Sequence, residues 1–304
     1  MKSYDELKSE MLSTDIFNSE HLILSTSQIC QQIKNNGYVY IENALSEKFL
    51  DQIEFDVGNY RFSANENMPS GVYTHGQYYF VNLLQISRSF YNYLTSNFIG
   101  NLCKSFFGDK FRLKALRYYE TYGKFNMQWH TDNKTDRGFA EIPGLIFIFY
   151  VSNVNDGEFQ YIEGSHNWSD TKAYNDYSDE YISQNHADKI RSFKGNRGSL
   201  IIYNTYGVHR AKPSNDPLLI RKSVFFQVDA EIENSEPIFL NTSFHNQNEV
   251  WVDQFLGFGL PQTYEVFPKS NVESLPLRVK FRLTKKMAIG KAIVKAIKLA
   301  LRNK

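Results

Sequence analysis

The chain has 304 residues and a mass of 35.5 kDa, which is enough for one large domain or two small ones. Hydrophobic residues make up 42% of the sequence and charged residues 22%, so wholesale disorder is excluded. No apolar run approaches the roughly 20 residues that a membrane-spanning helix needs. We therefore expect a globular protein with a sizeable core.

Charge is distributed unevenly along the chain. Ten of the 34 Lys/Arg residues and none of the 33 Asp/Glu residues lie in residues 278–304, which leaves 24 basic against 33 acidic residues in the body. An acidic body argues against nucleic acid as a ligand. The N-terminus is polar and has no apolar signal segment, and the two cysteines, Cys30 and Cys103, lack metal-ligand spacing. The sequence thus favours a reduced, cytoplasmic setting.

Helical patterns fill the first third of the chain. Capping residues followed by apolar residues at helical spacing predict helices that begin after residues 3, 25 and 46. The second of these ends at Gly37, and a short strand follows over residues 38–41. A further helix is predicted over residues 90–108.

After residue 108 the pattern changes to strands. The expected strands cover residues 111–120, 145–151, 158–162, 199–203 and 220–228. The second is continuously apolar, as is typical of a strand buried on both faces. The sequence Asn155-Asp156-Gly157 predicts a hairpin turn between the second and third strands. Helices followed by a run of strands favour an α+β fold with an antiparallel sandwich or barrel at its centre.

The sequence Gln128-Trp129-His130-Thr131-Asp132 suggests a metal site. In an extended segment, His130 and Asp132 point to the same side and can offer a nitrogen and an oxygen to one ion. His209, just after another predicted strand, is the candidate third ligand. Two His and one carboxylate leave a face open, which suits Fe(II) better than zinc. The alternative for an isolated His-x-Asp is a pair of solvated surface residues.

Arg221 and Ser223 begin the last predicted strand and share one of its faces. A guanidinium beside a hydroxyl matches the distal carboxylate of a dicarboxylic acid such as 2-oxoglutarate. Arg221 lies behind the metal if the strands over 199–203 and 220–228 pair as a hairpin. The alternative is an arginine that reaches solvent from a strand end.

These motifs together resemble the phytanoyl-CoA dioxygenase-like family of Fe(II)/2-oxoglutarate oxygenases. The segment 128–132 is similar to the proximal metal motif of that family. Residues 157–166, which end in Gly164-Ser165-His166, resemble its Gly-rich hairpin. Residues 198–203 followed by His209 are similar to its distal-His strand, and residues 36–41 are similar to its N-terminal signature. The likeness covers residues 28–228, and the motifs occur in the family's order.

The resemblance implies a double-stranded β-helix, also called a jelly roll or cupin-like fold. It implies His130, Asp132 and His209 as iron ligands and Arg221 as the 2-oxoglutarate anchor; Ser223 is added from strand alternation. It implies hydroxylation of a substrate C–H bond with O₂ and 2-oxoglutarate, which gives succinate and CO₂. Related halogenases have a small residue at the carboxylate position, so Asp132 favours hydroxylation. We expect one oxygenase domain over residues 1–270, with a helical flank over about 1–108 and a jelly-roll core over about 109–230.

The other histidines are assigned lesser roles. His166 is expected to be structural or to support the ligands from outside, and His75 is a candidate for the wall of a substrate pocket. A satisfied surface histidine is the favoured alternative for each. Trp129, between two predicted ligands, should point away from the metal into packing. Residues 64–78 and 167–194 are polar and loop-like and are predicted to form lids.

Residues 278–304 carry a basic amphipathic helix pattern. Ile289, Ile293, Ile297 and Leu301 recur every four residues, opposite a face rich in lysine. One interpretation is a helix on an anionic membrane surface, at the inner face, with a lipid, glycolipid or sugar as substrate. The other is a terminal helix packed on the acidic body.

Two competing functions stay open at this stage. One is a catalytically inactive jelly-roll protein that binds a ligand at the membrane. The presence of all three candidate metal ligands and of Arg221 argues against this function. The other is a cupin-like metalloenzyme that does not use 2-oxoglutarate. Arg221 is the residue that distinguishes a 2-oxoglutarate-dependent oxygenase from such an enzyme.

Overall fold

The structure is a computed structural model in which the following residues are described: 15–63, 71–74, 77–123, 127–132, 142–168, 177–230, 232, 235, 238–245, 250–260 and nine single positions between 287 and 301. The helix predicted to begin after residue 3 lies outside these residues.

The first described helix, α2 (Thr26–Asn36), has the ends that its sequence predicts. Ser25 Oγ accepts a hydrogen bond from the Gln28 N–H at 3.2 Å, and Gln28 Oε1 accepts one from the Ser25 N–H at 2.9 Å. This reciprocal pair satisfies two N–H groups of the helix end. Gly37 ends the helix with a φ of 93°, a left-handed conformation that glycine adopts without strain.

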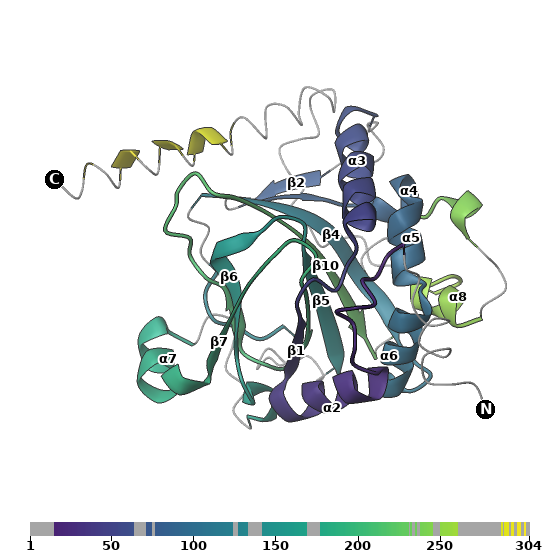
Figure 1. Ribbon diagram of the computed structural model, residues 1–304, viewed down its shortest axis with the longest axis horizontal. Helices are drawn as coiled ribbons and strands as arrows, with labels where there is room; N and C mark the ends of the chain where they lie inside the picture. The colour runs from purple at the N-terminus through teal and green to yellow at the C-terminus, as the bar shows by residue number, and fades with distance from the viewer. Residues whose placement is uncertain are drawn as a thin grey trace.

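The remaining helices lie mainly beside the large sheet (Figure 1). They are α3 (Glu47–Ser63), α4 (Leu83–Ile86), α5 (Arg88–Leu94), α6 (Asn97–Phe107), α7 (Asp179–Asn185) and α8 (Val250–Leu256), with 3₁₀ turns at Ser165–Asn167, Ala187–Lys189 and Thr242–Phe244. The single helix predicted over residues 90–108 is wrong, because Thr95 ends α5 and Ser96 starts α6. Ser96 Oγ accepts from the Ile99 N–H at 3.4 Å, and Ser96 is thus an N-cap inside the apolar pattern.

Two antiparallel sheets form the centre of the molecule. The large sheet has the strand order β1-β8-β5-β10-β4-β3-β2, and the small sheet has the order β7-β6-β9. The strands are β1 (Tyr38–Ile41), β2 (Gly71–Thr74), β3 (Gln77–Phe80), β4 (Arg112–Tyr122), β5 (Gly144–Tyr150), β6 (Val154–Ile162), β7 (Ile190–Gly195), β8 (Leu200–Asn204), β9 (His209–Ala211) and β10 (Ile220–Asp229). This arrangement confirms the predicted mixed fold with an antiparallel β core.

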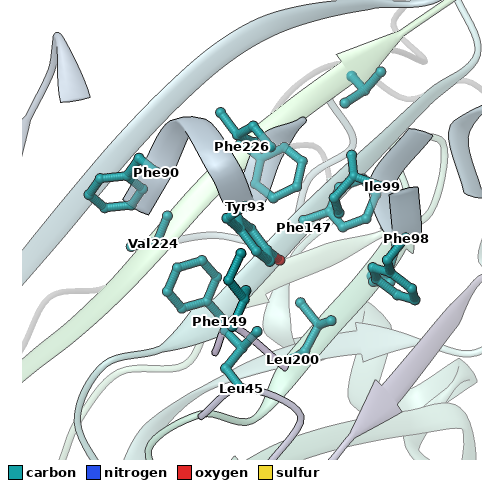
Figure 2. Packing of buried hydrophobic residues seen from close by; sticks show 14 of the residues in the cluster. Leu45, Phe90, Tyr93, Phe98, Ile99, Phe147, Phe149, Leu200, Val224 and Phe226 are labelled. Atoms are coloured by element: carbon teal, nitrogen blue, oxygen red, sulfur yellow. The ribbon is translucent and has the colours of Figure 1, made fainter. Parts of the chain in front are cut away.

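Strand β5 is buried on both faces, as its apolar run predicts. Its Phe147 and Phe149 pack in the core between the large sheet and the helices, whereas Ile146 and Tyr150 pack toward the small sheet. Figure 2 shows the helical side, where the Tyr93 ring lies 5.3 Å from Phe149, centre to centre. The alternation of side chains along β5 therefore supplies both cores.

The predicted hairpin at Asn155-Asp156-Gly157 is wrong. β5 and β6 belong to different sheets, and these three residues lie inside β6, where the pairing with β7 is irregular. Gly157 has a φ of 67°, and a Cβ placed on it would lie 3.2 Å from Nη1 of Arg221. The glycine is needed for a bulge and a close approach rather than for a two-residue turn.

The described residues of the C-terminal segment are helical and well exposed (yellow in Figure 1). Their large apolar side chains are between 37% and 68% exposed: Met287, Ile289, Ile293, Val294, Ile297 and Leu301. Within the described part of the chain, no helix is both long and apolar enough to cross a membrane. The division into residues 1–270 and 278–304 stays a prediction.

Candidate metal centre and its cavity

The two predicted histidine ligands face each other across a backbone pairing. The His130 N–H donates to the His209 carbonyl at 3.0 Å, and the His209 N–H donates to the His130 carbonyl at 2.9 Å. This antiparallel bridge places the two imidazole rings 4.3 Å apart, centre to centre. Asp132 is fixed nearby because its N–H donates to the Thr205 carbonyl at 3.1 Å.

The side chains of His130, Asp132 and His209 converge on one point, with ligand atoms that lie within 4.8 Å of one another. His209 Nε2 lies 3.3 Å from Asp132 Oδ2, and His130 Nε2 lies 3.8 Å from Asp132 Oδ1. Both imidazoles are about 3% exposed. Among the described residues, no donor with hydrogen-bonding geometry faces the buried Oδ2 atom. A carboxylate whose two oxygens each lie near a different imidazole nitrogen fits a divalent cation.

Backbone carbonyls set the orientation of both rings. His130 Nδ1 lies 2.7 Å from the Gln128 carbonyl oxygen, and His209 Nδ1 lies 3.0 Å from the Gly207 carbonyl oxygen. A carbonyl oxygen only accepts, so Nδ1 carries the proton and Nε2 keeps its lone pair. This is the tautomer that a metal requires of an Nε2 ligand, with the outer partner already in place.

Electrostatics favour a neutral His130 and an ionised Asp132. Burial, together with the neighbouring His209, lowers the pKa of His130 to about 4. Burial alone would raise the pKa of Asp132, but His209, His130 and Arg117 outweigh it and hold that pKa below its usual value. His130 and Asp132 thus have the protonation states that metal binding needs at neutral pH.

Arg221 and Ser223 line the same cavity as the three candidate ligands. Both lie on β10, where Arg221 is opposite Thr121 of β4 and Ser223 is opposite Tyr119 of β4 and Tyr150 of β5. The distal-His strand and β10 do not pair as a hairpin, because β5 lies between β8 and β10. Arg221 therefore reaches the cavity from the wall of the large sheet.

The Arg221 guanidinium forms no hydrogen bond or ion pair with any residue that the structure describes. Burial lowers its pKa, while Tyr150, Glu158 and Asp156 raise it. Asp156 does not pair with it, because its Oδ2 accepts from Ser214 Oγ at 2.9 Å and from the Asn215 N–H at 2.6 Å. A partly buried cation on a cavity wall is suited to a carboxylate ligand.

Trp129 points away from the centre, as strand alternation predicts. It packs with Ile162, Tyr177, Ile182 and Val208 in a separate apolar cluster. Its indole N–H donates to Asp179 Oδ1 at 3.0 Å, and the Arg210 guanidinium lies 4.2 Å from the ring centre. The residues next to two ligands, Trp129 and Arg210, thus stack on each other and help to fix the pairing of His130 with His209.

The other histidines that the structure describes lie outside the centre. His166 Nε2 lies 3.0 Å from the Lys34 carbonyl oxygen, which fits a structural role. The His186 ring lies 4.3 Å from the Trp168 ring, centre to centre, in a tilted arrangement, and His245 Nε2 lies 2.9 Å from Asp253 Oδ1. His75 lies outside the described residues, as do residues 64–70 and 169–176 of the predicted lids.

Sequence reasoning missed several residues of the cavity wall. Arg117, Tyr119 and Thr121 of β4 all line it, as does Tyr203 of β8. The Tyr203 hydroxyl lies 3.3 Å from His209 Nε2. The alternation of Arg117, Tyr119 and Thr121 along β4 was the available signal, because every second residue of a strand faces the same side.

The chain matches no protein-family model and no curated protein. Its fold is similar to several solved structures. One is HygX from Streptomyces hygroscopicus with nickel and 2-oxoglutarate bound, at 13% identity and a TM-score of 0.53, over 68% of this chain and 87% of HygX. Another is the non-heme alpha ketoglutarate dependent epimerase SnoN from nogalamycin biosynthesis, at 13% identity and a TM-score of 0.51, over 83% of this chain and 95% of SnoN.

These likenesses define the class of fold. The chain has the jelly-roll fold of non-haem iron, 2-oxoglutarate-dependent enzymes, which confirms the predicted fold. The predicted cofactors agree with the ligands of the neighbours, since HygX is also described with iron bound. Membership of the phytanoyl-CoA dioxygenase family stays a prediction.

Proposed function

We propose that the protein is a non-haem iron oxygenase that hydroxylates a C–H bond of an organic substrate with O₂ and 2-oxoglutarate. One observation carries this proposal. His130, Asp132 and His209 converge with both Nε2 atoms available, and Arg221 lines the same cavity without a partner among the described residues. Two imidazoles and one carboxylate on one side of an ion leave its other side open to ligands.

When bound, iron would supply the oxidative chemistry, with 2-oxoglutarate decarboxylated to succinate and CO₂. The chain's own residues hold and orient the reactants. The three side chains hold the metal through atoms already oriented by backbone carbonyls. Arg221 pairs with the distal carboxylate of 2-oxoglutarate, and the hydroxyl of Ser223, two residues along the same strand, donates to it. Phe225 and Ile148 supply an apolar wall that limits water.

The competing functions predict different outcomes in one assay. An oxygenase releases succinate only with Fe(II), O₂ and 2-oxoglutarate present, and His130→Ala abolishes this release. An inactive binding protein releases none under any condition. A metalloenzyme that does not use 2-oxoglutarate binds metal, but its metal-loaded form neither binds nor consumes that acid. Turnover of 2-oxoglutarate that is unchanged in Arg221→Ala contradicts the anchor assignment.

The fate of the substrate is a finer point of the proposal. Asp132 occupies the carboxylate position, which leaves no ligand place for a halide and favours hydroxylation. Succinate release in the presence of acyl-CoA, sugar and lipid candidates, followed by mass spectrometry, tests this. A product heavier by one oxygen atom supports hydroxylation, whereas an unchanged product mass points to another outcome such as epimerisation.

We further propose that the C-terminal helix binds an anionic membrane surface. The described apolar residues of this segment are exposed rather than packed on the body, which favours the membrane interpretation over the packed one. Lysines share the segment with this apolar stripe, and no acidic residue occurs from residue 278 onward. Such a helix inserts its apolar face at the lipid boundary while its lysines pair with anionic headgroups.

Vesicle flotation tests the membrane proposal with two matched variants. Wild-type protein should float with vesicles of phosphatidylcholine and phosphatidylserine, and float less with phosphatidylcholine alone. Ile293→Asp with Ile297→Asp removes the apolar contact, and Lys291→Glu with Lys298→Glu removes the charge contact. Equal flotation of wild type and both variants contradicts the proposal.

A further inference from the structure

Tyr203 lines the cavity from β8, and its hydroxyl lies beside a candidate metal ligand. The hydroxyl oxygen is 3.3 Å from His209 Nε2, the nitrogen that the metal would use. Nδ1 of His209 carries the proton, so Nε2 accepts and the Tyr203 hydroxyl donates. The tyrosine therefore directs a hydrogen-bond donor at the place where the metal and its ligands would be.

Aromatic packing holds the Tyr203 ring in this position. The residue is 2% exposed. Its ring centre lies 4.8 Å from that of Phe159, 5.8 Å from that of Tyr161 and 4.7 Å from that of His209. Because a side chain in a close-packed cluster has little room to move, we expect the hydroxyl to stay beside the centre when a metal binds.

A bound metal and the Tyr203 hydroxyl compete for the same lone pair. A metal on His209 Nε2 takes the acceptor to which the hydroxyl donates. The Asp132 carboxylate does not replace it, because its Oδ2 atom has no described donor in hydrogen-bonding geometry and its Oδ1 atom lies toward His130. A buried hydroxyl without an acceptor is costly, so an oxygen of another ligand on the metal is the natural partner.

The order of residues along β6 shows which end of the cavity Tyr203 serves. Tyr161, whose ring packs on that of Tyr203, is opposite His209 of β9. Gly157, four residues earlier in β6, lies against Arg221. Arg221 is the proposed partner of the distal carboxylate of 2-oxoglutarate. The keto-acid end of that molecule, which chelates the metal, is therefore the end next to Tyr203.

We infer that the Tyr203 hydroxyl donates a hydrogen bond to the keto-acid end of metal-bound 2-oxoglutarate. This inference rests on the proposed function and adds a residue that positions the co-substrate. Arg221 and Tyr203 then hold opposite ends of the same molecule, which fixes its orientation across the cavity. A hydrogen bond to a charged acceptor is about twice as strong as one between neutral groups.

The test measures the binding of two acids to the full chain loaded with Mn(II), without turnover. 2-Oxoglutarate has both ends, whereas pyruvate has the keto-acid end and no distal carboxylate. Displacement of water from the bound Mn(II), followed by water proton relaxation, gives both affinities. Tyr203→Phe should weaken the binding of both acids by about tenfold, and Arg221→Gln should weaken only that of 2-oxoglutarate.

Tyr161→Phe is the matched control. Its hydroxyl is also buried, but it donates to the Asn204 carbonyl at 3.3 Å and not to the centre. This variant should bind both acids as the wild type does. The affinity for Mn(II) alone should not fall in Tyr203→Phe, because the change removes a competitor for His209 Nε2 and no ligand. Circular dichroism and thermal unfolding check that each variant folds.

A crystal structure of the wild type with Ni(II) and 2-oxoglutarate gives an answer that needs no variant. The Tyr203 hydroxyl should lie within about 3 Å of an oxygen of the keto-acid end. A hydroxyl that stays on another acceptor, with the co-substrate bound, overturns the inference.

Four binding results would also overturn it. Unchanged affinity for both acids in Tyr203→Phe means that the hydroxyl does not bind them. A loss for 2-oxoglutarate alone assigns Tyr203 to the distal carboxylate, and equal losses in Tyr161→Phe assign the effect to packing. A fall in Mn(II) affinity as large as that in His209→Ala makes Tyr203 a metal ligand.

The wild type separates this inference from the proposed function. Wild-type protein that binds no Mn(II) or 2-oxoglutarate contradicts the proposed function itself, and with it the inference. Wild-type protein that binds both leaves the proposed function standing, whatever the Tyr203 variant shows.

Discussion

Each imidazole of the candidate centre is held by the backbone carbonyl two residues before it in the chain. The carbonyls of Gln128 and Gly207 accept from the Nδ1 atoms of His130 and His209. Local chain geometry thus fixes the tautomer before any ion arrives. The same extended conformation that points His130 and Asp132 to one side also places a carbonyl within reach of the ring.

Removal of one ligand should weaken metal binding strongly. Loss of a residue that only hydrogen-bonds a metal ligand lowers metal affinity by roughly 10–100-fold. We expect His209→Ala, which removes a ligand itself, to lower the affinity for Mn(II) by more than this. Calorimetry with Mn(II) measures this, and His21→Ala is the control because His21 is exposed and far from the centre in sequence. Equal affinities of the two variants would contradict the assignment of His209.

The stability of the metal-free protein should depend on His130 in weakly acidic solution. The pKa of His130 is about 4 in the folded protein against an ordinary value of 6.5, so the folded state binds fewer protons than the unfolded state between these values. Its contribution is fully present above pH 6.5 and is lost as the pH falls toward 4. A shift of this size corresponds to about 3 kcal/mol. Urea unfolding at several pH values should give a steeper loss for wild type than for His130→Asn.

At the scale of elements, β6 positions the anchor that β10 carries. Gly157 lies against Arg221, and the loop that follows β9 is tied to β6 through Asp156, Ser214 and Asn215. The bulge in β6 therefore supports the Arg221 side chain in the wall of the cavity. This contact joins the small sheet to the large sheet at the end of the cavity where the distal carboxylate of 2-oxoglutarate is proposed to bind.

Gly157→Ala should impair co-substrate binding without affecting the metal. A Cβ at this position meets Arg221 Nη1 at 3.2 Å, and the positive φ adds about 1–2 kcal/mol of strain. Gly164→Ala is the matched control, because Gly164 has a similar φ of 77° but no atom within 4 Å of its Cβ position. Both variants should lose stability, and only Gly157→Ala should lose 2-oxoglutarate affinity. Equal affinities in a calorimetric titration would count against the positioning role of this contact.

The alternation of side chains along the sequence predicts much of the fold and of the candidate site. The remaining features depend on how the strands are ordered in the sheets. His130 and Asp132 follow from local spacing, as do the ends of α2 and the double burial of β5. His209 is the candidate third ligand because it follows another predicted strand and because the family resemblance implies it. The pairing of β10 with β4 and β5 does not follow, because a partner strand is chosen by the packing of the whole sheet. Arg117 escaped notice for that reason, and Gly157 resembled a turn because glycine serves turns and close approaches alike.

At the scale of the whole molecule, one sheet separates the core from the cavity. Phe226 of β10 faces the helices and stacks on Phe147 at 4.3 Å, whereas the adjacent Phe225 lines the cavity. The helical layer in Figure 2 thus stabilises the face opposite to the site. Stability and function are therefore assigned to opposite faces of the same strand.

Truncation of these two neighbours should separate stability from function. Phe226→Ala should lower the free energy of unfolding by about 3–5 kcal/mol because it opens a cavity in a fully buried cluster. Phe225→Ala should lower the free energy of unfolding clearly less, since its side chain is only partly buried. It should instead change the binding of ligands in the cavity. Urea unfolding of both variants measures the difference, and equal losses would contradict the division of faces.

Anomalous X-ray scattering from crystals grown with Ni(II) and 2-oxoglutarate tests the central claim most directly. The account predicts one strong peak bonded to Nε2 of His130, Nε2 of His209 and a carboxylate oxygen of Asp132, with the distal carboxylate of 2-oxoglutarate on Arg221. A peak elsewhere, or no metal at these three side chains at saturating Ni(II), would contradict it.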